Sequence, residues 1–89
     1  MVPIIENHAE ISGELLSVAP HKERPGFVEL RVRATDARNV GEWPNLFARD
    51  VGETIVVMAR EGSAAASAKP GPVTFKVKKT GPGTSFAED

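Results

Sequence analysis

The chain has 89 residues, with eleven Lys and Arg against twelve Asp and Glu, and a formal net charge of −1. This length suits one domain, which we expect to cover residues 1–89. The absence of cysteine excludes disulfides, thiolate metal sites and a cysteine nucleophile, and the near-neutral charge argues against a general electrostatic DNA binder. We find no apolar run long enough for a membrane span and no basic-then-apolar leader, so we expect a cytoplasmic protein without membrane contact.

Glycine and proline residues divide the first half of the chain into two predicted strands. The first covers residues 10–19, and Gly13 within it indicates a bulge or a sharp bend. A polar loop bounded by prolines follows at 20–26. Residues 27–35 alternate strictly between polar and apolar, which predicts a half-buried strand. The apolar face of that strand would consist of Val28, Leu30, Val32 and Ala34.

The second half begins with an irregular connection at 36–50. Residues 54–60 are β-branched and apolar on both faces, which predicts a strand that is central or covered. The Ala- and Ser-rich segment 61–69 fits a short helix or a flexible loop equally well. Residues 73–80 alternate again and predict a strand, and 84–87 would add a last short pairing.

These elements predict a mainly β fold: a small closed or partly open barrel of four or five antiparallel strands with at most one short helix, around 61–69. The order of the elements is similar to that of the OB-fold across residues 10–87. No motif supports the similarity, so it implies no ligand. The long connection at 36–50 departs from a compact OB-fold and leaves an SH3-like barrel or a small sandwich open. We expect loosely ordered ends at 1–9 and 84–89.

Basic side chains project from two of the predicted strands. Arg31 and Arg33 lie on the polar side of one, and Lys76 and Lys78 on that of another. If these strands are neighbours, they form a basic face, and Phe27 is in phase with the arginines for base stacking. These five residues are the candidate ligand or nucleic-acid site. The alternative is a solvated strand face with acidic cross-strand partners.

Large apolar side chains interrupt the polar connection. Trp43, Leu46 and Phe47 are candidate protein-interface residues, since Trp and Phe are enriched at interface hot spots. The alternative, which we favour for Trp43, is that these side chains fold back over the end of the barrel core.

Three acidic or imidazole side chains near the start have the spacing of a metal site. Glu6, His8 and Glu10 would point the same way from an extended chain and reach one divalent metal. Such a run is more typical of a solvated edge, where charge also blocks aggregation. His21, in the first loop, is interpreted as a surface histidine. We expect no cofactor.

The sequence contains no nucleophile elbow, catalytic-triad spacing or phosphate-binding loop. It therefore favours a non-enzymatic binding or assembly module of unknown ligand, although an enzyme of unrecognised type stays open. Because a small core without disulfides or metal often gains from a partner subunit, a homo-oligomer or a protein partner is expected. The alternative is an OB-like domain that binds single-stranded nucleic acid through the basic strand face.

Overall fold

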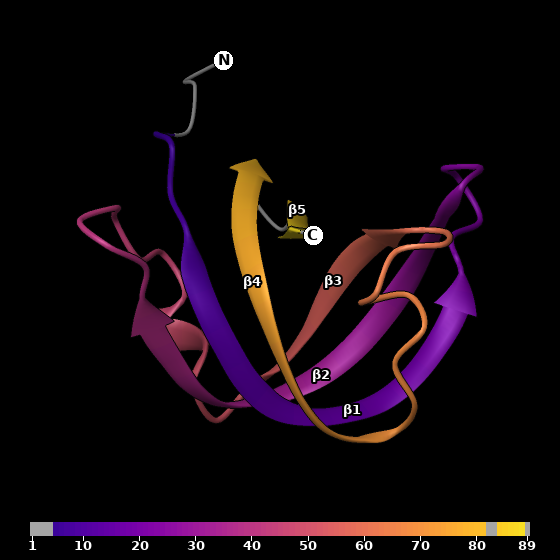
Figure 1. Ribbon diagram of the computed structural model, residues 1–89, viewed down its shortest axis with the longest axis horizontal. Coiled ribbons are helices and arrows are strands. Elements are labelled where there is room, and N and C mark those ends of the chain that lie inside the picture. Colours follow the sequence, from indigo (N-terminus) through magenta and orange to yellow (C-terminus); the bar gives the residue numbers. More distant parts are fainter. Residues whose placement is uncertain (1–4, 82–83, 89) are drawn as a thin grey trace.

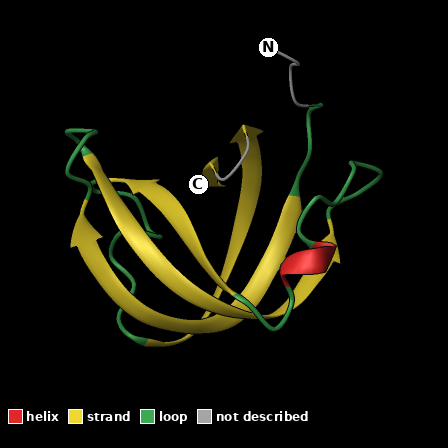
Figure 2. Ribbon diagram, turned by 180° about the vertical axis from the view of Figure 1, so that it is seen from behind, coloured by secondary structure: helices red, strands yellow, loops and turns green. Residues whose placement is uncertain are grey.

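The computed structural model describes residues 5–81 and 84–88, which form five strands and one short helical turn. Figure 1 labels the strands and colours them from the N-terminus to the C-terminus, and Figure 2 shows the short helical turn in red. The strands are β1 (Ala9–Pro20), β2 (Phe27–Asn39), β3 (Thr54–Arg60), β4 (Gly71–Gly81) and β5 (Thr84–Glu88), and the 3₁₀ turn η1 (Ala48–Asp50) precedes β3.

The strands close into a barrel in the order β1-β2-β3-β5-β4, with β4 returning to β1. In Figure 1 the long strands β1 and β2 curve together across the lower part of the view. Every strand has two neighbours, which confirms the predicted OB-fold-like barrel and excludes a two-sheet sandwich. The barrel is mixed rather than wholly antiparallel, because β5 pairs in parallel with β3 at Met58 and Phe86.

The core lies inside the barrel and is built from the inward side of each alternating strand. On β2, Leu30, Val32 and Ala34 are fully buried, and on β4 Val77 is fully buried while its neighbours Lys76 and Lys78 are exposed. The predicted alternation of both strands is therefore confirmed. The largest fully buried side chains are Phe47, Ile11, Leu15, Leu30, Val32, Val57, Val77 and Asn7.

Gly13 allows β1 to bend between its two partner strands. The pairing of β1 with β2 shifts register between Ser12 and Gly13, as the predicted bulge requires. A Cβ atom on Gly13 would overlap the backbone carbonyl oxygen of Arg33 on β2. The strands therefore approach each other more closely here than any other residue type would allow.

β2 is longer than its alternation predicts. It continues from residue 35 to Asn39 because residues 36–39 pair with 9–12 of β1. This extension shortens the connection that the sequence placed at 36–50. Cross-strand partners, rather than side-chain alternation, determine where β2 ends.

The segment 61–69 forms successive turns and no helix. The Oγ of Ser63 accepts a hydrogen bond from the backbone N–H of Ala66, and the N–H of Ser67 donates to the carbonyl of Ser63. Ala65 is buried against the core. A run this short, with Pro70 directly after it, does not recover the entropic cost of starting a helix.

Residues 1–4, 82, 83 and 89 lie outside the described residues, so the expectation of loosely ordered ends concerns them only in part. Of the remaining end residues, Asn7 is buried and Ala9 begins β1. Residues 84–88 form β5, in which Ser85 is buried.

Gly13→Ala should destabilise the barrel by about 2 to 3 kcal/mol, because the added methyl group forces β1 and β2 apart. The matched control is Gly81→Ala on β4, where a Cβ would meet no atom within 4 Å. Urea unfolding followed by circular dichroism measures both free energies of unfolding. Equal stability of the two variants would contradict the close approach at Gly13.

Candidate functional site

A row of alternating aromatic and cationic residues crosses four adjacent strands on the outside of the barrel. Phe27 of β2 lies opposite Arg60 of β3, and Phe86 of β5 lies opposite Lys78 of β4. The parallel pairing of Met58 with Phe86 brings the two halves of the row together. The barrel therefore assembles these four side chains from segments far apart in the sequence.

The four side chains surround a surface pocket of about 410 Å³, which Thr80 and Ala87 also line. The rings of Phe27 and Phe86 pack edge to face, with their centroids 5.7 Å apart. The guanidinium of Arg24 lies 5.4 Å from the centroid of the Phe86 ring. Two aromatic rings with cations beside them can stack on a planar group and hold an anion at the same time.

The loop at 21–26 is held in a defined shape that presents Arg24. The Nδ1 atom of His21 accepts hydrogen bonds from the backbone N–H groups of Glu23 and Arg24, both at 3.1 Å. An accepting Nδ1 carries no hydrogen, so the hydrogen of the neutral ring lies on Nε2, which is 3.9 Å from Glu29. The N–H of Phe27 donates to the carbonyl of Arg24 and closes the loop.

Two of the five residues predicted for a ligand site, Phe27 and Lys78, line this pocket. Arg31 and Arg33 lie farther along β2, and Lys76 lies farther along β4. The pocket thus uses one residue from each of these two strands and not the predicted basic face as a whole.

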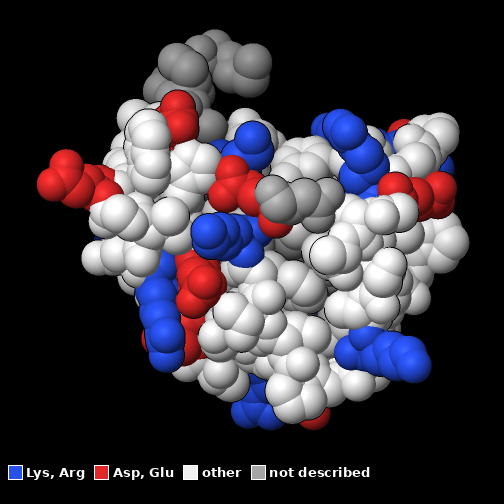
Figure 3. Space-filling view, in the orientation of Figure 1, with Lys and Arg blue, Asp and Glu red and all other residues white. Residues whose placement is uncertain are grey.

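The two predicted basic rows are not neighbours, because β1 lies between β2 and β4. Glu14 of β1 is opposite Arg33, and Glu10 of β1 is opposite Lys76. Acidic residues therefore interrupt the surface that the sequence joined into one basic face. On the face shown in Figure 3, basic and acidic side chains are likewise interspersed.

Sequence reasoning missed Arg24, Arg60 and Phe86. The sequence alone places Arg24 in the loop before Phe27, Arg60 at the end of the strand 54–60, and Phe86 in the last short strand. Their convergence depends on the β3–β5 contact, which pairs strands separated by the whole of β4 and which no local pattern indicates.

Of the aromatic side chains in the connection after β2, one lies in the core and the other on the surface. Phe47 is fully buried, because the side chain of Asn45 accepts from its N–H and donates to the carbonyl of Ala37, which folds the chain inward. Trp43 is 47% exposed, although the sequence favoured its burial over the end of the core, and Leu46 is half-buried.

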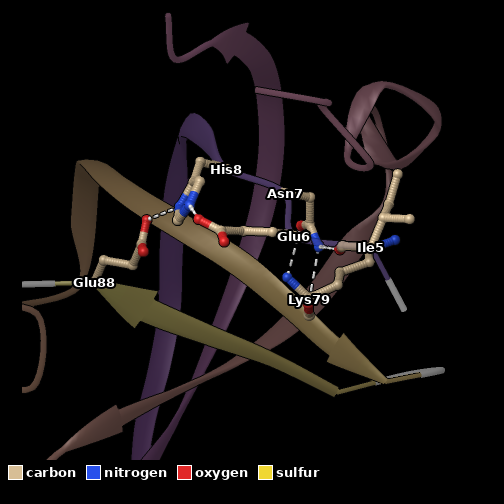
Figure 4. A network of polar contacts seen from close by, with 6 residues as sticks. All are labelled: Ile5, Glu6, Asn7, His8, Lys79 and Glu88. Atoms are coloured by element: carbon tan, nitrogen blue, oxygen red, sulfur yellow. Dashed lines mark hydrogen bonds and ion pairs between the residues drawn. The ribbon is translucent and has the colours of Figure 1, made fainter. Parts of the chain in front are cut away.

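His8 contacts two carboxylates, one through each ring nitrogen. Its Nε2 lies 3.0 Å from Glu6, and its Nδ1 lies 2.9 Å from Glu88 of β5 (Figure 4). The hydrogen bonds to Glu6 and Glu88 raise the pKa of His8 above its ordinary value. Trp43 packs edge-on against the imidazole, with the ring centroids 5.0 Å apart.

The three candidate metal ligands Glu6, His8 and Glu10 do not converge on one point. Glu10 lies on β1 opposite Lys76, and the second carboxylate on His8 comes from Glu88 instead. Within 5–81 and 84–88, no group of three or more His, Cys, Asp or Glu side chains is arranged to hold a metal ion.

Asn7 attaches the segment before β1 to the end of β4. Its side chain is buried, donates to the carbonyls of Ile5 and Lys79, and accepts from the N–H of Lys79 (Figure 4). The Nζ of Lys79 lies 3.1 Å from Asp50 and 5.0 Å from the centroid of the Phe47 ring. The hydrogen bonds of Asn7 with Lys79 hold the segment 5–8 against the barrel.

No family model, curated protein or solved structure matches this chain. In the part of the chain that the structure describes, no helix has the length and apolar character needed to cross a membrane.

Asn7→Asp should lower the free energy of unfolding by about 2 kcal/mol, because this substitution removes the buried amide donor that bonds two carbonyls. The control is Asn39→Asp, where the exposed side-chain oxygen accepts from Asn45 and the substitution keeps that acceptor. Chemical denaturation at neutral pH compares the two. A stability loss at Asn39 as large as that at Asn7 would contradict this role of the Asn7 amide.

Proposed function

We propose that the protein is a non-enzymatic binding module that holds single-stranded nucleic acid in the pocket around Phe27 and Phe86. The observation that carries the proposal is the alternation of these two rings with Arg60 and Lys78 across four strands. Proteins that bind single strands combine aromatic platforms for the bases with cations that follow the phosphates.

The charge of the pocket supports an anionic ligand despite the net charge of −1. Among the described residues, Arg24, Arg60 and Lys78 form no ion pair. Lys79, by contrast, is paired with Asp50. The cations at the pocket are therefore available to a ligand, whereas Lys79 is neutralised within the fold.

The position of the pocket supports an oligonucleotide as the ligand. It lies where β2 leaves the loop 21–26 and where β4 approaches β5. OB-folds bind oligonucleotides and oligosaccharides on the face of their second and third strands and at the loops beside it. Because cations surround the two rings, the negatively charged oligonucleotide is favoured over the oligosaccharide.

Replacing both lining cations in Arg60→Gln/Lys78→Gln should weaken binding of a labelled single-stranded oligonucleotide about tenfold at low salt. The slope of log affinity against log salt should also fall by about 1.4, which is about 0.7 for each phosphate that the variant no longer neutralises. Fluorescence anisotropy over a salt series measures both quantities.

The matched control removes the same charge from β2, away from the pocket, in Arg31→Gln/Arg33→Gln. It should change the affinity much less than the pocket variant does. Equal reductions in affinity in the two variants would assign binding to general surface charge, and no binding by the native protein at high micromolar concentration would reject the function.

A further inference from the structure

The segment before β1 and the last residue of β5 are joined at one imidazole. His8 contacts Glu6 on its own segment and Glu88 on β5 through its two ring nitrogens (Figure 4). The backbone N–H of His8 donates to the carbonyl of Pro44, and Trp43 covers one edge of the ring. His8 is thus fixed by its own segment and by two parts of the chain that are distant in sequence.

The contact between His8 and Glu88 involves β5, the strand that also carries Phe86 of the pocket. Phe86 and Glu88 are two residues apart on β5 and project from the same side of the strand. β5 has only five residues, and among the described residues it pairs with β3 through Met58 and Phe86 alone. Its end is therefore held by β4 and by the contact of Glu88 with His8.

The number of ring protons decides whether His8 can hold both carboxylates. An imidazolium has two N–H donors and can donate to Glu6 and Glu88 together, whereas a neutral imidazole has one. After the proton leaves, one ring nitrogen presents a lone pair to a carboxylate oxygen about 3 Å away. That contact is repulsive, so a neutral ring can hold only one of the two carboxylates, and loss of the Glu88 contact would release the end of β5.

We propose that protonated His8 is a positioning residue that holds the end of β5, and with it Phe86, so that ligand affinity falls as His8 loses its proton. This inference rests on the proposed function for its effect on binding, but the hold on β5 can be measured without any ligand.

Other charged groups surround this contact. Lys76 of β4 lies opposite Glu88, and Glu10 of β1 lies opposite Lys76. Glu42 is the neighbour of Trp43 in the loop before β3. Of all these groups, Glu6 and Glu88 are the two that touch the ring and raise the pKa of His8.

The sign of the pH effect follows from the raised pKa of His8 in the folded chain. The stabilisation from the charged ring is complete below the unfolded pKa of about 6.5 and is lost as the pH rises through the higher folded value. Positioning of Phe86 should be lost over the same range. Oligonucleotide affinity should therefore decrease from mildly acidic to alkaline pH.

The first experiment measures oligonucleotide affinity at constant ionic strength from about pH 6 to about pH 9. The native protein should lose about fivefold in affinity. His8→Gln should bind weakly throughout with little pH dependence, and Glu88→Gln, which retains a neutral acceptor, should also flatten the profile. Glu53→Gln, which removes an exposed carboxylate in the turn before β3, should keep the native pH dependence. A profile unchanged in His8→Gln would overturn the proposal.

The second experiment follows amide hydrogen exchange of β5 in the ligand-free protein over the same pH range, after correction for the intrinsic rate. Protection of the amides of residues 85–88 should fall as His8 deprotonates in the native protein, and should be low and constant in His8→Gln. This result would stand even if no oligonucleotide bound, so failure of the proposed function and failure of the His8 contact are distinguishable. Unchanged protection across the pH range would reject the contact as a positioning device.

Discussion

Closure of the barrel by β5 is the constraint on which the fold and the candidate site both depend. Among the described residues, this five-residue strand joins β4 along its length and meets β3 at the pair of Met58 with Phe86. Without it, β3 and β4 would present unpaired backbone groups at two open edges. Because Phe86 is the closing residue and also lines the pocket, the pocket exists only in the closed barrel.

The arrangement of strands also explains how a chain with net charge −1 can present a cationic site. β1 lies between β2 and β4 and places Glu10 and Glu14 opposite Lys76 and Arg33. Charges in the middle of the barrel therefore face opposite charges. At the end of the barrel near Phe86, cations lie beside aromatic rings instead. Local pairing, rather than net charge, determines where an anion can bind.

Local patterns predicted well those features that local physics controls. The alternation of 27–35 indicated the inward face of β2, and Gly13 indicated the bulge in β1, because side-chain period and the space for a Cβ are properties of short segments. The patterns did not predict that β2 continues to Asn39, since that depends on β1. They did not separate buried Phe47 from exposed Trp43 either, because the turn at Asn45 makes that distinction.

The sequence by itself determined that the protein is mainly β and has no cysteine chemistry, because composition and two-residue periodicity are carried by neighbouring residues. Only the tertiary structure decided which cations share a surface. Arg60, Lys78 and Phe86 meet because β3 and β5 pair across the closed barrel, and His8 meets Glu88 because the segment before β1 and the end of β5 reach the same side of it. Such contacts depend on strand order, which hydrophobic alternation does not encode.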